Sequence, residues 1–175
     1  MKLIYTTETL CKKEDLLICI PTLEINAFAI PITQNTNWES LYLKYDLPIL
    51  HQKNFLEIDG VKVDIKKCAL ELLGDSSFQS ITTFLSNLAS KRDIKCFKLC
   101  EYVFYNGFEL KIAVAKTSMV LTNIISENPN MEKPIESVMK IRVGDIYLPW
   151  YDCSTDNQIS WYSEQKKVLK KLLGV

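Results

Sequence analysis

The sequence predicts an α+β fold, in which hairpins build a mainly antiparallel sheet and helices pack on one of its faces. Turn pairs that contain a glycine separate apolar runs at 59–60, 106–107 and 144–145. Asp-Gly and Asn-Gly are strong hairpin signals, because these residues accept positive φ angles. Two longer segments carry apolar residues at helical spacing. With 47% hydrophobic residues in 175, the chain can bury a core.

The first fifty residues predict strands and one short helix. Met1–Tyr5 alternates like a strand, and the apolar runs 16–20 and 23–32 favour buried strands over helices. Residues 37–45 place their aromatic and apolar side chains on one helical face, with a polar capping residue at the start.

The middle of the chain predicts a hairpin followed by two helices. The runs on either side of Asp59-Gly60 alternate over residues 55–65. Residues 66–73 then favour a helix that Gly74 ends. A second helix follows from a capping residue at 75–77 and extends to about residue 91.

Two more hairpins lie in the second half of the chain. The first turns at Asn106-Gly107 between residues 95–105 and 108–114, and the second turns at Gly144-Asp145. Residues 118–125 fit a helix and a strand equally well.

The chain ends in a segment with an apolar stripe, which predicts a helix capped by Asn157. Residues 1–125 are expected to form an α+β core domain. Residues 126–175, the last hairpin and helix, are either a small second unit or part of the same domain.

Charge and cysteine content restrict the class of protein. The 21 basic and 21 acidic residues cancel, which argues against a nucleic-acid partner held by a basic surface. The six cysteines lie mostly among apolar residues, which favours thiols in a reducing compartment. No apolar run is long enough to span a membrane or to act as a signal peptide. We therefore expect a location in a host cytoplasm or in a virion.

The sequence contains no complete catalytic motif. His51 is the only histidine, so a Cys-His or Ser-His pair would have to use it. Cys96 and Cys100 would lie about 13 Å apart on a strand, too far to share one metal ion. All five glycines are isolated, which excludes a glycine-rich phosphate loop. The prediction is a protein without catalytic residues, metal or cofactor.

Aromatic and basic residues near the end of the chain are the candidate interface. Tryptophan and tyrosine are enriched at interfaces as well as in cores, and lysines on the last helix could dock on an acidic protein surface. Packing in the core and solvation remain the alternatives. The candidate interface residues are Trp150, Tyr151, Trp161, Tyr162, Lys166 and Lys170.

One stretch resembles a known family. Residues 121–125, Asn128-Pro129 and 141–149, which include Val143-Gly144-Asp145 and Pro149, are similar to the end of a LysM-like module. Such endings occur in tail and baseplate proteins of contractile phages. The resemblance, over residues 121–149, implies a role in assembly.

These observations together predict a non-catalytic subunit that binds other protein subunits, as in a phage tail or baseplate. An immunity protein or antitoxin that neutralises a toxin is the first alternative, since it needs no catalytic residues either. An enzyme that uses a cysteine with His51 is the second.

Overall fold

The computed structural model describes residues 1–7, 12–28, 32–33 and 35–175. The chain forms two compact units, each assembled from separated segments. Unit 1 comprises residues 1–54, 100–115 and 162–175, and unit 2 comprises residues 55–99 and 116–161. These two units are defined by contacts within the folded chain. The division into residues 1–125 and 126–175 is a different one, and it stays a prediction.

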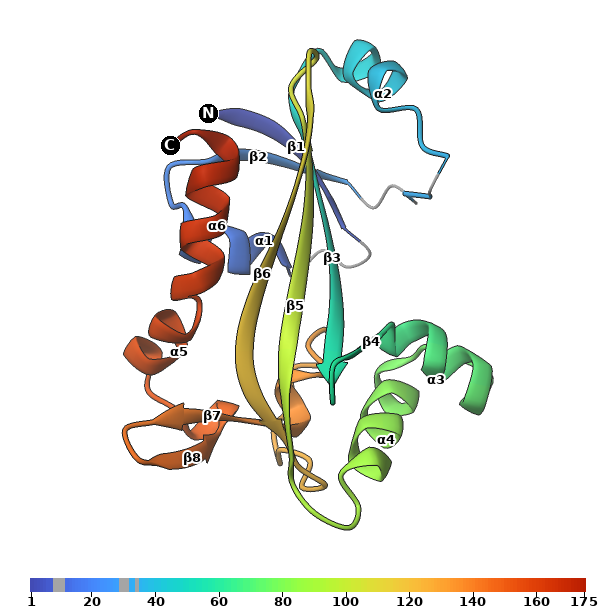
Figure 1. The fold of residues 1–175 in the computed structure, drawn as a ribbon, viewed down its shortest axis with the longest axis vertical. Coiled ribbons are helices and arrows are strands. Elements are labelled where there is room, and N and C mark those ends of the chain that lie inside the picture. The colour runs from blue at the N-terminus through green and yellow to red at the C-terminus, as the bar shows by residue number, and fades with distance from the viewer. Residues whose placement is uncertain (8–11, 29–31, 34) are drawn as a thin grey trace. The chain divides into compact units, whose positions relative to one another are not determined.

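The α+β prediction is confirmed. The described residues form six α-helices and an eight-stranded, mostly antiparallel sheet, in which the strand order is β2-β1-β3-β5-β6-β7-β8 and β4 pairs with β3. The strands are β1 (Lys2–Thr7), β2 (Glu24–Phe28), β3 (Ile49–Ile58), β4 (Val61–Val63), β5 (Ile94–Tyr105), β6 (Leu110–Leu121), β7 (Met139–Val143) and β8 (Ile146–Pro149). All three predicted hairpins are present, at β3–β4, β5–β6 and β7–β8 (Figure 1).

The N-terminal part of unit 1 contains the parallel strands of the sheet. β1 lies between β2 and β3 and runs parallel to both, with Thr6 opposite Phe28 on one side and His51 on the other (Figure 1). α1 (Lys12–Cys19) connects β1 to β2. The prediction of a strand at 16–20 is wrong, because Leu16 and Cys19 are buried at helical spacing in α1. The predicted strand 23–32 is confirmed as far as Phe28, and residues 29–31 lie outside the described part.

Unit 1 also contains the helices α2 and α6. α2 (Trp38–Tyr45) begins where Asn37 Oδ1 accepts a hydrogen bond from the Ser40 backbone N–H, as its sequence predicts. α6 (Ser163–Leu173) ends at Gly174 and packs against α1. Gly107 turns the β5–β6 hairpin with a φ of +94°, a left-handed value that favours glycine.

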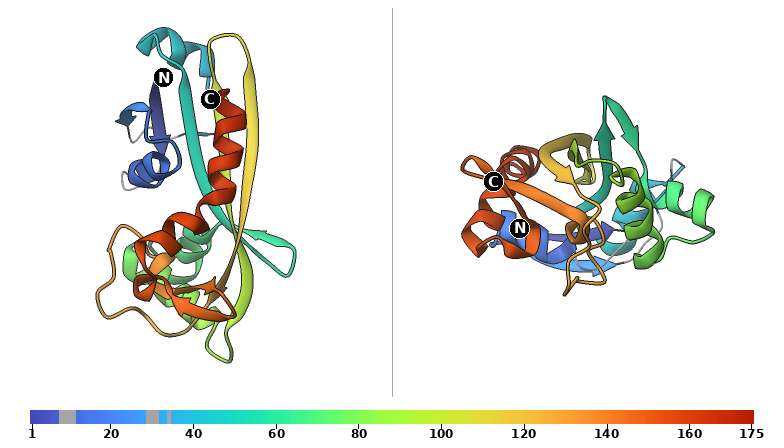
Figure 2. Two further views of the ribbon diagram at one scale, coloured as in Figure 1. Left: turned by 90° about the vertical axis from the view of Figure 1, so that its left-hand side faces the viewer. Right: turned by 90° about the horizontal axis from the view of Figure 1, so that it is seen from below.

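The two predicted helices of unit 2 are confirmed. α3 (Ile65–Leu73) begins at Asp64, whose side chain accepts a hydrogen bond from the Lys67 backbone, and it ends at Gly74. α4 (Phe78–Leu88) begins at Ser77 and packs against α3 (Figure 2).

The rest of unit 2 differs from the predictions in two places, the LysM-like segment 121–149 and the helix cap at Asn157. Residues 118–121 belong to β6, and a short 3₁₀ turn, η1 (Glu136–Val138), leads into β7. β7 pairs with both β6 and β8, so the strands within residues 121–149 belong to the large sheet and do not close a small LysM-like module. After η2 (Trp150–Asp152) comes α5 (Thr155–Trp161), and Asn157 lies inside this helix rather than at its cap. No helix in the described ranges is long and apolar enough to cross a membrane.

Candidate functional site

The carboxyl end of β1 is a topological switch point. β1 leads through α1 to β2 on one side, whereas β3, on its other side, is reached later in the chain. Ligands of open α/β sheets bind where the connections leave neighbouring parallel strands in opposite directions. In this protein that point lies between β1 and β3, where Thr6 is paired with His51.

One face of these two strands carries a buried hydroxyl–imidazole pair. Thr6 Oγ1 and His51 Nδ1 lie 2.9 Å apart and share a hydrogen bond, in which the hydroxyl donates when Nδ1 carries no proton. Thr6 is fully buried and His51 is 7% exposed. The half-buried ring of Trp38 lies 6.4 Å from the imidazole, between ring centroids. Because side chains alternate along a strand, the half-buried Lys53 follows His51 on this face.

The opposite face of the same strands carries a chain of hydrogen bonds. The Tyr5 hydroxyl donates to Gln52 Oε1 at 2.7 Å, and Gln52 Nε2 donates to Asn54 Oδ1 at 2.9 Å. Tyr5 and Gln52 are almost completely buried. A buried network of this kind holds its members in one arrangement, so the backbone of β3 at the switch point is rigidly placed.

The described residues were compared with what a metal site and a reactive thiol require. Among residues 1–7, 12–28, 32–33 and 35–175, no three His, Cys, Asp or Glu side chains come together as metal ligands. Burial raises the pKa of Cys96 to about 11, and desolvation with the nearby Asp152 charge raises the pKa of Cys153. A raised pKa leaves little thiolate near neutral pH, so neither thiol is an activated nucleophile.

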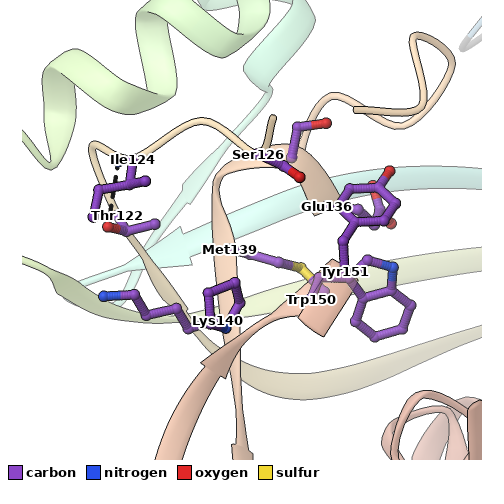
Figure 3. A pocket seen from close by; sticks show the side chains of 10 residues that line it. Thr122, Ile124, Ser126, Glu136, Met139, Lys140, Trp150 and Tyr151 are labelled. Atoms are coloured by element: carbon purple, nitrogen blue, oxygen red, sulfur yellow. Dashed lines mark hydrogen bonds between the residues drawn. The ribbon is translucent and has the colours of Figure 1, made fainter. Parts of the chain in front are cut away.

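Unit 2 has a small pocket of its own between β7, η1 and η2. Trp150, Tyr151 and Glu136 lie on one side of it, and Thr122 and Lys140 lie on the other (Figure 3). The pocket has a volume of about 50 Å³, which is enough for a few water molecules. Pockets for cofactors and drug-sized ligands are several times larger, so this pocket does not fit a nucleotide.

Glu136 of this pocket belongs to a buried ion pair. Lys98 Nζ on β5 donates to Glu136 Oε1 at 2.7 Å, and both side chains are at least 94% buried. Burial alone would raise the pKa of Glu136, but the charge and hydrogen bond of Lys98 hold it below its ordinary value. Lys98 Nζ also lies 5.2 Å from the centre of the Trp161 ring, a cation–π contact that adds to the stabilisation of the buried charge.

The predicted interface residues fall into two groups. Trp150, Trp161 and Tyr162 are less than 10% exposed, so most of their surface is buried within the chain. Trp150 and Trp161 pack edge to face, with ring centres 5.2 Å apart. Tyr151 is half-buried, and Lys166 and Lys170 on α6 are exposed. An interface role for these residues remains a prediction.

Sequence reasoning missed most of the polar residues that the fold brings together. His51 lies in β3 and contacts Thr6, which is 45 residues away in the chain. The polar run 51–54 between the apolar pairs at 49–50 and 55–56 was the available signal, since a strand that carries function can be polar in its middle. No pattern in the sequence around Lys98 or Glu136 indicates that the two residues form a buried pair.

Comparisons with known proteins identify the fold. No protein-family model matches the sequence, and a search of curated proteins gives no match. The chain is similar to the Ham1 protein of Staphylococcus aureus, with a TM-score of 0.65 and 12% identity over 98% of this chain and 96% of that one. It is also similar to a Mycobacterium abscessus protein described as a nucleoside-triphosphatase or dITP/XTP pyrophosphatase. There the TM-score is 0.62 and the identity 10%, over the full length of both chains.

This similarity corrects the functional predictions. The LysM-like resemblance of residues 121–149 is wrong, because the whole chain has a different fold. The predictions of a phage tail or baseplate subunit, of other protein subunits as partners, and of a place in a virion are wrong as well. The expectation of a protein that is not an enzyme is also wrong, since the fold is that of a protein described as a pyrophosphatase. Neither the toxin-neutralising nor the Cys/His51 alternative gains support. At 10–12% identity, what is shared with these proteins is the fold.

Proposed function

We propose that this chain is an enzyme that hydrolyses a nucleoside triphosphate to the nucleoside monophosphate and pyrophosphate. One observation carries the proposal: its fold is similar over 98–100% of its length to the Ham1 protein and to a dITP/XTP pyrophosphatase. In the proposed reaction, water adds to the α-phosphorus, and the bond from that phosphorus to the bridging oxygen breaks. Pyrophosphate then leaves, and the proton of the water passes to a base or to solvent.

The switch point of unit 1 supports this proposal. Ligands bind at such points in open sheets, and the Thr6–His51 pair is a polar group held in one position there. An imidazole is the side chain best suited to accept a proton near neutral pH. We assign to His51 Nε2 the proton from the attacking water, in the tautomer in which Nδ1–H donates to Thr6 Oγ1. Thr6 then orients the ring.

The cysteines bear on the compartment in which the enzyme acts. Cys68, Cys96 and Cys153 form no disulfide, and we place the enzyme in a reducing compartment such as the cytoplasm. This location is part of the proposal.

The test is an assay for both products on a panel of nucleoside triphosphates that includes dITP and XTP. The purified chain should release monophosphate and pyrophosphate in equal amounts, measured by anion-exchange chromatography. His51→Asn should lower kcat by about 100-fold or more, since general base catalysis contributes that much. Lys166→Gln, on the exposed face of α6, is the matched control and should leave kcat unchanged.

Two outcomes would contradict the proposal. The first is that no triphosphate of the panel is cleaved by the folded protein. The second is that His51→Asn retains full activity while its thermal unfolding matches that of the parent chain, which would remove His51 from the reaction.

A further inference from the structure

The half of β6 that lies nearest to its hairpin turn has a free edge. Across the turn, the Asn106 N–H donates to the Glu109 carbonyl at 3.4 Å. Hydrogen-bonded pairs of an antiparallel ladder recur at every second residue, so the odd-numbered residues of β6 bond to β5. The N–H and C=O groups of Leu110, Ile112 and Val114 therefore point away from β5, towards the outer edge of the sheet.

Further along β6 this outer edge is covered. The Ser118 carbonyl accepts a hydrogen bond from Trp161 Nε1 at 2.9 Å, and β7 pairs with residues 120–121. Beside residues 110–114, no strand pairs with β6 in the part of the chain that the structure describes (Figure 2). Proteins usually protect such an edge with charges, proline or a covering segment, because an unpaired edge binds another strand readily. The edge at 110–114 is thus open to a further strand.

The side chains along this edge are apolar and exposed. Leu110 is 47% exposed, Ile112 65% and Val114 49%, and Phe108 in the turn is 94% exposed. Branched and aromatic residues of this kind suit a strand that is at least half-buried. An apolar edge strand that is exposed to water favours association with another chain.

The charges at this edge favour a second copy of the same segment. Glu109 and Lys111 pair within the chain at 2.6 Å, and both side chains are about half-exposed. When two copies lie antiparallel with Leu110 opposite Leu110, Glu109 of each copy lies opposite Lys111 of the other. Opposite charges directly across an antiparallel pair are stabilising. In the same register Phe108 lies opposite Ile112 of the second copy, so the segment is complementary to itself in both charge and hydrophobicity.

We propose that this chain forms a homodimer in which the β6 edges of two copies pair antiparallel about a two-fold axis at Leu110. The pairing uses the free edge of both copies, so it closes at two chains and involves no other kind of protein. Because residues 108–112 make the direct pairing, the interface is small, and the dimer is expected to dissociate on dilution. This inference is independent of the reaction proposed above.

The oligomeric state can be measured by sedimentation velocity on a dilution series of the full chain. As the concentration rises, the mass should increase from the 20.2 kDa of one chain to twice that value and no further. A chain that stays monomeric at millimolar concentration, or that forms larger oligomers, would overturn the proposal.

Charge variants test the match between the two copies. Glu109→Lys and Lys111→Glu each turn two attractions across the axis into repulsions, and each should weaken dimerisation by about 10-fold or more. The double variant Glu109→Lys/Lys111→Glu again places opposite charges across the axis and should recover most of the affinity of the parent chain. Lys166→Gln, an exposed change on α6 in the same unit, is the control. A double variant as weak as the single ones would contradict the pairing.

Cysteine variants test the position of the axis. Directly opposite residues of a hydrogen-bonded antiparallel pair have Cα atoms about 5.5 Å apart, which a disulfide spans. On oxidation, Leu110→Cys should therefore form a covalent dimer on a non-reducing gel, against the parent chain as background. Val114→Cys changes a similarly exposed residue, but in this register its two copies lie about 27 Å apart along the strands, so it should not cross-link.

Circular dichroism and thermal unfolding confirm that each variant is folded. Equal cross-linking of Leu110→Cys and Val114→Cys would place the contact elsewhere and overturn the proposal. A dimer in solution in which Leu110→Cys does not cross-link would overturn it as well.

Discussion

Replacing Lys98 by methionine tests how the buried ion pair of unit 2 contributes to stability. Methionine keeps most of the length of the side chain and removes its charge, so Glu136 is left buried without its 2.7 Å partner. Breaking a buried pair in this way costs about 3–5 kcal/mol of unfolding free energy. Lys98→Met should therefore be strongly destabilising at neutral pH. The double variant Lys98→Met/Glu136→Met removes both charges and should regain most of that loss, since apolar replacements of buried pairs are often neutral.

Acidification changes the contribution of Glu136 to stability in opposite directions in the parent chain and in Lys98→Met. In the parent chain the pKa of Glu136 is below its ordinary value of 4.5. The stabilisation by this group is therefore present above that ordinary value and is lost as the pH falls through the folded-state pKa. In Lys98→Met only burial acts on Glu136, which raises its pKa. The penalty in the variant is then largest at neutral pH, and it shrinks as the carboxyl becomes protonated on acidification.

Tryptophan fluorescence during urea unfolding is a suitable assay. Trp150 and Trp161 lie in unit 2, and Trp161 contacts Lys98, so a Trp38→Phe background makes the signal report on this unit. The ion-pair argument would be refuted if Lys98→Met loses less than about 1 kcal/mol at neutral pH, or if the double variant is no more stable than the single one.

Three further predictions follow from local geometry. Gly107→Ala should lower the midpoint of thermal unfolding measured by circular dichroism, because a Cβ there would lie 2.7 Å from the Tyr42 ring at a φ of +94°; an unchanged midpoint would contradict this. Ser80→Ala should raise the pKa of Asp75 from about 2 towards 3.8 in an NMR titration, since the Ser80 hydroxyl is the strongest of the hydrogen bonds that lower it. The stability linked to this depressed pKa is present above the unfolded-state value and is lost as the pH falls towards 2. In the native protein, Cys96 should be alkylated slowly near neutral pH, because burial raises its pKa to about 11, and mass spectrometry of the intact protein measures this.

The hairpins were predictable because their signals are local. Turn residues such as Asp59-Gly60 and Asn106-Gly107 fix both the position and the register of two neighbouring strands. The helix caps at Asn37 and Asp64 are local in the same way. Each of these features depends on interactions within a few residues, so the sequence pattern contains the needed information.

The parallel strands and the residues at the β1–β3 switch point could not be predicted from local sequence patterns. Parallel pairing of β1 with β2 and β3 joins segments that are far apart in the chain, and no turn residue specifies it. The strand predicted at 16–20 is wrong because periodicity alone does not distinguish a strand from a buried helix in so short an apolar run. The side chains at the switch point are brought together only by that non-local pairing, so the sequence could show His51 but not its neighbours.

The interleaving of the two units affects how the chain is made. Residues 1–54 of unit 1 leave the ribosome well before residues 162–175, which complete the same unit. About a hundred residues separate these segments, and at 5–20 residues per second their synthesis takes about 5–20 s. During that interval the apolar face that α6 will cover is exposed, and long-range pairing is intrinsically slow. The nascent chain is therefore expected to depend on chaperones more than a protein whose domains are continuous in sequence.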